Sequence, residues 1–98
     1  MATRQLRQFF NNGNIGRIER LLTEEGVPLN IDTTGLTKTA ANERTLNAMK
    51  EYFNRIGMNE RTEYVTRDDA ISRLRTLINE HKQHERQVQN EAEYESVR

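Results

Sequence analysis

The sequence lacks several residue types, and each absence excludes a class of structure or chemistry. None of the 98 residues is a cysteine or a tryptophan, and only one is a proline. The lack of cysteine excludes disulfides, thiolate metal sites and thiol catalysis. No apolar run approaches the roughly 18 residues that a membrane-spanning helix needs. The opening residues also lack the apolar stretch of a secretory signal. We therefore expect a cytoplasmic protein that does not enter a membrane.

An excess of charge of either sign is also missing. The chain has 15 Lys+Arg and 15 Asp+Glu, so its formal net charge is zero. This balance argues against a histone-like polycation and against an acidic mimic of DNA. The mean hydropathy of -0.96 is polar, but apolar residues recur at helical spacing, which indicates a folded chain. At this length the chain forms one domain with a small core.

The first apolar stripes predict a pair of short helices. The first should run from about residue 4 to residue 11, with Thr3 as its N-cap. Asn14 can cap the second, and Gly26, followed by the single proline, ends it. We expect these two helices to form a helical hairpin.

An irregular segment and a third helix follow. Residues 27–38 alternate like a strand for a few positions and then turn, so we expect an extended loop with at most one short bridge to residues 64–65. The third helix should begin near Thr37 or Thr39 and end at Gly57.

The fourth helix has the clearest start signal in the sequence. Thr66 is its predicted N-cap, and two aspartates follow in the first turn, where the helix dipole favours anions. Beyond His81 the apolar content falls. We therefore predict a helical domain over residues 1–85, followed by a polar C-terminal helix extension or disordered tail over residues 86–98. The predicted fold class is all-α: a small four-helix domain with an irregular extended segment between helices 2 and 3 and a long C-terminal helix. The predicted core consists of Leu6, Phe9, Phe10, Ile18, Leu21, Leu22, Leu46, Met49, Phe53, Ile56, Ile71, Leu74 and Ile78.

No constellation in the sequence predicts catalysis. His81 and His84 are three residues apart on the fourth helix, a spacing that can direct two imidazoles at one metal ion. A third ligand is not evident nearby, so we expect no metal. Neither serine has the setting of a nucleophile, and the paired aspartates are explained by helix capping. We therefore expect no enzyme activity and no cofactor.

Arginine usage is the stronger bias. Twelve of the 15 basic residues are arginine, whose planar donors suit phosphate, carboxylate and interface contacts. Arg4, Arg7, Arg17 and Arg20 face only Glu19 as an opposing charge in the first 20 residues. The helical hairpin is therefore predicted to carry a positive patch that binds either an acidic protein surface or nucleic acid.

The fourth helix offers a second predicted binding surface. If Ile71 and Leu74 are core positions of a heptad, the later positions become polar, which favours docking on a larger partner or a loose homodimer over an autonomous coiled coil. The residues predicted to contact a partner here are Arg73, Leu77, His81, His84 and Val88.

The predicted function is non-catalytic protein binding, as an adaptor, inhibitor or regulator of a larger protein. In its short length and its Asn and Thr content, the chain resembles small accessory proteins of phages, viruses and mobile elements. The alternative is a small dimeric nucleic-acid-binding regulator that uses the Arg-rich hairpin. Under the preferred interpretation, nucleic acid binds weakly and is released near physiological salt.

Overall fold

The computed structural model describes the backbone of residues 2–96 and the side chains of residues 2–86. This part of the chain is mostly helical, which confirms the predicted helical character, and it also contains a short two-stranded sheet. The elements in chain order are β1 (Arg4–Gln5), α1 (Leu6–Phe9), the 3-10 turn η1 (Asn12–Asn14), α2 (Ile15–Glu24), α3 (Lys38–Arg55), β2 (Glu63–Tyr64) and α4 (Arg67–Ser96).

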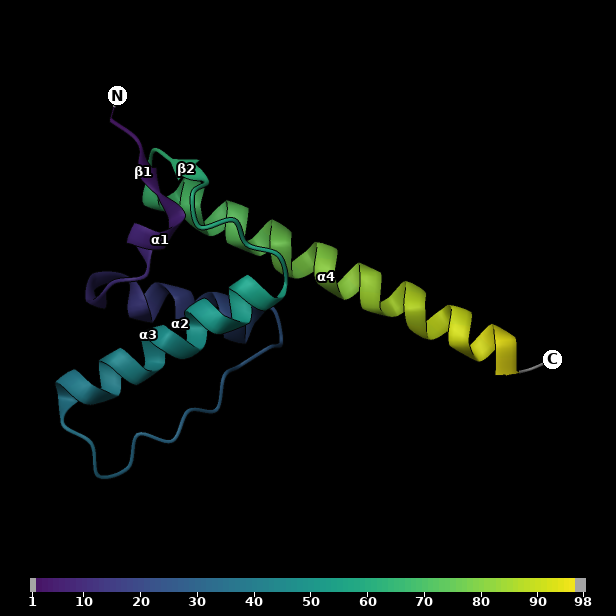
Figure 1. The fold of residues 1–98 in the computed structure, drawn as a ribbon, viewed down its shortest axis with the longest axis horizontal. Coiled ribbons are helices and arrows are strands. Elements are labelled where there is room, and N and C mark those ends of the chain that lie inside the picture. The colour runs from purple at the N-terminus through teal and green to yellow at the C-terminus, as the bar shows by residue number, and fades with distance from the viewer. Residues whose placement is uncertain (1, 97–98) are drawn as a thin grey trace.

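The helices form an open arrangement around α2. This helix packs against both α3 and α4, while α1 packs against α4. Figure 1 shows the body of the molecule at one end of α4, with the second half of α4 leading away from it. The segment between α2 and α3 makes a wide loop without helix or strand. The molecule is consequently flat and long, with extents of 53 × 42 × 20 Å.

Most residues of the predicted core are buried, but on α3 and α4 the set of buried residues differs from the predicted one. The buried members of the predicted set are Leu6, Phe9, Phe10, Ile18, Leu21, Leu22, Met49, Phe53, Leu74 and Ile78. Leu46, Ile56 and Ile71 are only partly buried and pack against the edge of this cluster. Four further residues are buried that the stripes did not include: Tyr52, Met58, Tyr64 and Ala70. Met58 and Tyr64 lie outside the helices, so helical periodicity could not identify them.

Local signals set most of the helix ends. The Thr37 hydroxyl accepts a hydrogen bond from the Ala40 N–H at 3.2 Å, and the Thr66 hydroxyl accepts one from the Asp69 N–H at 3.1 Å. Both N-cap predictions are confirmed. At the predicted end of α3, Met58 N–H donates to the Phe53 carbonyl and Gly57 N–H donates to the Asn54 carbonyl, which is a Schellman pattern. Gly57 has a φ of +106°, a backbone conformation that favours glycine.

The N-terminus differs from the prediction of a helix over residues 4–11 capped by Thr3. Residues 4 and 5 form β1, which pairs antiparallel with β2 so that Arg4 lies opposite Tyr64. The helix that follows has only four residues. The segment between α2 and α3 is the predicted loop, and it makes no bridge to residues 64–65, because β1 pairs with β2 there. The all-α prediction is corrected to a helical fold with one two-stranded sheet, formed by segments that lie far apart in the sequence.

Asn14 also differs from its predicted role. Its side chain makes no N-cap hydrogen bond to α2. It is buried instead, and its Nδ2 donates to the Phe9 carbonyl at 2.9 Å. The Asn11 side chain accepts from the Gly13 N–H at 2.9 Å and so caps the 3-10 turn. The buried amide thus connects the end of α1 to the start of α2 by a hydrogen bond. The predicted helical hairpin is replaced by a four-residue helix, a 3-10 turn and α2.

α4 is by far the longest element, with 30 residues. Its backbone remains helical to Ser96, but the side chains from residue 87 onward, including that of Val88, lie outside the described part. Within residues 2–96, no helix combines the length and the apolar character needed to cross a bilayer.

Candidate functional site

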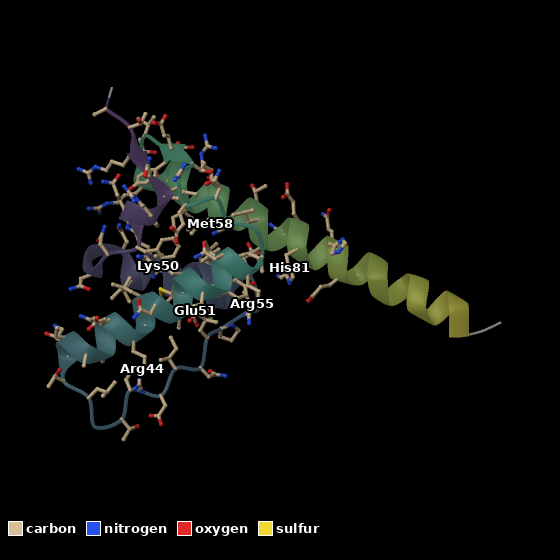
Figure 2. All side chains as sticks on the ribbon, in the orientation of Figure 1. Arg44, Lys50, Glu51, Arg55, Met58 and His81 are labelled. Atoms are coloured by element: carbon tan, nitrogen blue, oxygen red, sulfur yellow. The ribbon has the colours of Figure 1, made fainter. Side chains whose placement is uncertain are left out.

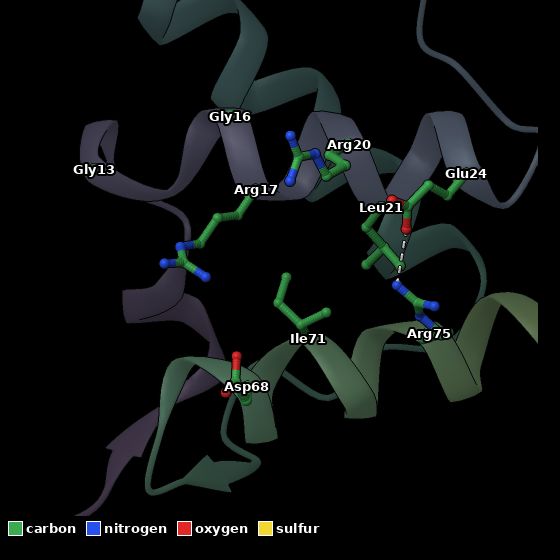
Figure 3. Close-up of a pocket in the computed structure, with 9 residues that line it drawn as sticks. All are labelled: Gly13, Gly16, Arg17, Arg20, Leu21, Glu24, Asp68, Ile71 and Arg75. Carbon is green, nitrogen blue, oxygen red and sulfur yellow. Dashed lines mark hydrogen bonds and ion pairs between the residues drawn. The ribbon is translucent and has the colours of Figure 1, made fainter.

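A groove of about 540 Å³ lies between α2 and the first half of α4. α2 turns Ile18, Leu21 and Leu22 into the core, which leaves Arg17 and Arg20 exposed. Gly16 has no side chain on this face, and the space where a Cβ would lie is open. Figure 3 shows the two helices flanking the groove. Its lining residues are Gly13, Gly16, Arg17, Arg20, Leu21, Glu24, Asp68, Ile71 and Arg75.

An ion-pair cluster connects the two helices at the end of the groove near the C-terminus of α2. Arg75 Nη2 lies 3.1 Å from Glu24 Oε2, and Arg75 Nε lies 3.6 Å from Glu25 Oε1. Lys82 adds to the cluster, because its Nζ lies 3.6 Å from Glu25 Oε2 and also donates to the Glu25 carbonyl oxygen. These contacts cross-link the C-terminal turn of α2 to α4. The charge of Arg75 is therefore used within the chain.

The charges of Arg17 and Arg20 are not used in this way. Among the side chains of residues 2–86, neither forms an ion pair. In Figure 3 the Arg17 side chain extends from α2 toward α4, the Arg20 guanidinium lies beside α2, and Asp68 lies on the opposite wall. Arg17, Arg20 and Asp68 leave one net positive charge at this end of the groove.

The groove also has an apolar floor. Leu21 is buried, whereas Ile71 is partly buried and packs against the core at its edge. Figure 3 shows the Ile71 side chain rising from α4 toward α2. An apolar floor beside free guanidinium groups is suited to a segment that carries both apolar and acidic side chains.

The structure divides the predicted Arg-rich patch. Arg17 and Arg20 line the groove, whereas Arg4 on β1 and Arg7 on α1 are exposed but do not line it. The sequence reasoning missed Ile71 and Arg75 as partners of the arginine pair. Their spacing with Asp68, at i, i+3 and i+7, was the signal that one flank of α4 could face α2.

Arg73 and Leu77 lie in a second depression, on another side of α4. It measures about 380 Å³ and is lined by Leu6, Gly57, Asn59, Thr62, Arg73, Thr76 and Leu77. Arg73 Nε lies 3.6 Å from Asp69 Oδ1 on the same helix. Leu77 packs partly against the core. Neither residue therefore lines the groove between α2 and α4.

His81 lies in a third depression, where α4 passes the end of α3. Figure 2 shows its side chain near Arg55, and both line a space of about 330 Å³ together with Tyr52. His81 Nε2 lies 3.2 Å from Glu85 Oε1. The Tyr52 hydroxyl is buried without a hydrogen-bond partner among the described atoms, and burial raises the pKa of Tyr52. His84 is exposed and does not line this space. Within the described side chains, no cluster of three or more His, Cys, Asp or Glu residues could hold a metal ion.

Comparison with known proteins adds no relative. No family model matches the chain, and no curated protein or solved structure shows a significant match.

Proposed function

We propose that this protein is a non-catalytic protein-binding module, an adaptor, inhibitor or regulator, and that the groove between α2 and α4 receives an acidic, partly apolar segment of a larger protein. The observation that carries the proposal is the exposed pair Arg17 and Arg20 beside the apolar residue Ile71. Guanidinium groups form bidentate contacts with carboxylates, and the apolar floor gives a bound segment area to bury.

The exposure of the groove supports a macromolecular ligand. All five charged residues that line it are exposed: Arg17, Arg20, Glu24, Asp68 and Arg75. Small-molecule sites usually enclose most of their ligand and desolvate their polar groups. An open groove with solvated charges on its rim is typical of a protein interface, in which charges at the rim guide association and apolar contacts at the centre retain the partner.

A nucleic-acid ligand is the second candidate function. It is favoured by the exposure of Arg4, Arg7, Arg17 and Arg20 within one short N-terminal stretch. Each phosphate contact releases counterions, so such binding would fall steeply with salt. The apolar floor of the groove favours the protein ligand, because a phosphate backbone gains nothing from Ile71.

The proposal is tested by titrating the isotope-labelled protein with two synthetic helical peptides, one with an acidic and apolar face and one with lysine in place of each acidic residue. We expect the acidic peptide to shift the amide resonances of residues 13–24 and 68–75, and the lysine peptide to leave them in place. The double variant Arg17→Glu/Arg20→Glu should weaken binding of the acidic peptide by about tenfold or more, since each exposed pair lost or reversed contributes up to about 1 kcal/mol.

A matched control separates local recognition from net charge. Lys38→Glu/Arg61→Glu makes the same change in net charge at exposed positions outside the groove. It should leave the affinity for the acidic peptide within about twofold, because exposed charges more than about 10 Å apart are largely screened. If both double variants weaken binding equally, or if the shifts map to β1 and α1, the groove is not the site. Tight binding of duplex DNA that survives 200 mM salt would instead favour the nucleic-acid function.

A further inference from the structure

The groove between α2 and α4 contains a third guanidinium group, which a carboxylate of the chain itself occupies. Arg75 lies on the α4 wall, and its Nη2 lies 3.1 Å from Glu24 Oε2. Glu24 also lines the groove, so its carboxylate lies where a carboxylate of a bound segment could lie (Figure 3). We infer that Glu24 competes with the partner for Arg75, and that a bound acidic segment displaces Glu24 and pairs with Arg75. This regulation rests on the proposed function, because it acts on the same groove.

Glu24 is held by a weak contact. Its side chain is 51% exposed, and the side chain of Arg75 is 44% exposed. Exposed ion pairs contribute little stability, because water screens the charges and two long side chains lose freedom when they pair. Among the side chains of residues 2–86, Glu24 forms no other ion pair. Its release therefore costs the fold little, and the carboxylate of a partner can take its place.

Arg75 has a second contact that keeps it in the groove when Glu24 is released. Its Nε lies 3.6 Å from Glu25 Oε1, and the Glu25 side chain is only 15% exposed. Lys82 holds Glu25 in turn, because its Nζ lies 3.6 Å from Glu25 Oε2 and donates to the Glu25 carbonyl oxygen. A guanidinium presents N–H donors on more than one edge. The Nε edge can thus remain on Glu25 while the Nη groups bind a second carboxylate.

The three guanidinium groups define a spacing for the acidic residues of the partner. Arg17 and Arg20 project from α2, and Arg75 reaches the groove at the level of Glu24 (Figure 3). Positions 17, 20 and 24 share one face of α2, because three and then four residues separate them. The helix rises about 10 Å over this distance. We therefore expect a helical partner segment with acidic residues at i, i+3 and i+7, or at i, i+4 and i+7 in the reverse direction, and an apolar residue over Ile71.

The competition makes the third acidic residue of the partner the one that is selected. A segment with two acidic residues can pair with Arg17 and Arg20 while Glu24 stays on Arg75. A third carboxylate near Arg75 meets the like charge of Glu24 until Glu24 is displaced. Glu24 therefore lowers the affinity for every segment that places an acidic residue there, which is a repulsive element of specificity.

Calorimetric titration of the full chain with a helical peptide tests the competition. The peptide carries glutamate at i, i+3 and i+7 and leucine at i+4. At about 150 mM salt, Glu24→Gln should bind this peptide about fivefold more tightly than the wild type, because a competing exposed carboxylate is removed. Glu19→Gln is the matched control, since it makes the same change in charge at an exposed position of α2 that does not line the groove. It should change the affinity by less than about twofold.

A double-mutant cycle tests whether the gain depends on Arg75. In the Arg75→Gln background, Glu24→Gln should give no further gain, because no guanidinium is released. Two further peptides, with glutamine at i or at i+7, test the same point without any change at Arg75. One of them should bind the wild type and Glu24→Gln equally, and it identifies the end of the segment that lies beside Arg75.

Three results would overturn the competition and leave the proposed function standing, because the peptide would still bind the groove. The first is equal affinity of the wild type and Glu24→Gln for the three-glutamate peptide. The second is an equal gain from Glu19→Gln, and the third is a gain that persists in the Arg75→Gln background, since Glu24 would then act through net charge alone. Absence of peptide binding in the wild type and in every variant would refute the proposed function together with the competition.

Discussion

Phe53 is the residue whose truncation tests the packing of α3 most directly. Its side chain is completely buried, at 0% exposure. Its ring centroid lies 5.7 Å from that of Phe10 and 5.3 Å from that of Tyr52. Phe53 therefore links α3 to the segment that joins α1 to α2, and it also packs against Tyr52 within α3.

The expected cost of Phe53→Ala follows from that burial. Truncating a buried phenylalanine to alanine costs about 3 to 5 kcal/mol, which combines lost transfer free energy with the cavity left behind. A domain of this size has a free energy of unfolding of about 5 to 15 kcal/mol. The variant should lose between about a fifth and all of its stability, and its Tm should fall by more than about 10 °C.

Urea denaturation followed by far-ultraviolet circular dichroism measures this loss, because the chain has no tryptophan to report by fluorescence. Leu36→Ala is the matched control: Leu36 is apolar but 36% exposed on the loop between α2 and α3. That variant should change the unfolding free energy by less than about 1 kcal/mol. A Phe53→Ala protein as stable as the Leu36→Ala control would refute the packing of α3 described above.

Three further substitutions test individual contacts. Tyr52→Phe removes a buried hydroxyl without a described partner. The free energy of unfolding from urea denaturation at pH 7 should therefore stay equal or rise by up to about 1 kcal/mol. Because burial raises the pKa of Tyr52, wild-type stability should decline as the pH rises above about 10, the value in the unfolded chain, and a pH series should show a smaller decline for the variant. Asn14→Ala removes the Nδ2 donation to the Phe9 carbonyl, which keeps its hydrogen bond from the Asn11 N–H, and should cost about 0.5 to 1.5 kcal/mol in a urea melt; an unchanged midpoint would contradict the buried amide contact. Gly57→Ala places a Cβ at a φ of +106° and should lower stability by about 1 kcal/mol or more, whereas the same change at Gly16 meets open space and should not.

Sequence reasoning placed the arginines but not the site. Arg17 and Arg20 were identified from their charge alone, together with Arg4 and Arg7. The tertiary structure separates these pairs, because Arg17 and Arg20 on α2 line the groove with Ile71, whereas Arg4 and Arg7 do not. The groove is formed by two helices that are far apart in the sequence, and the local sequence of either helix does not predict which of its faces will lie against the other.

The helix boundaries show what the sequence by itself determined. Thr37, Thr66 and Gly57 act through hydrogen bonds and backbone angles within a few residues, so these ends could be predicted where they occur. The apolar stripes likewise placed Phe53 and Leu74 in the core, because one period of 3.6 residues decides which side chains share a face.

Only the tertiary structure determined the secondary structure of residues 4 and 5. Residues 4 and 5 have the composition of a helix start, but they pair with residues 63 and 64 and become a strand. The same long-range packing buries Asn14 against the Phe9 carbonyl, whereas its sequence context favours a helix cap. In both places the local preference amounts to about 1 kcal/mol, and hydrogen bonds and apolar burial gained against distant segments outweigh it.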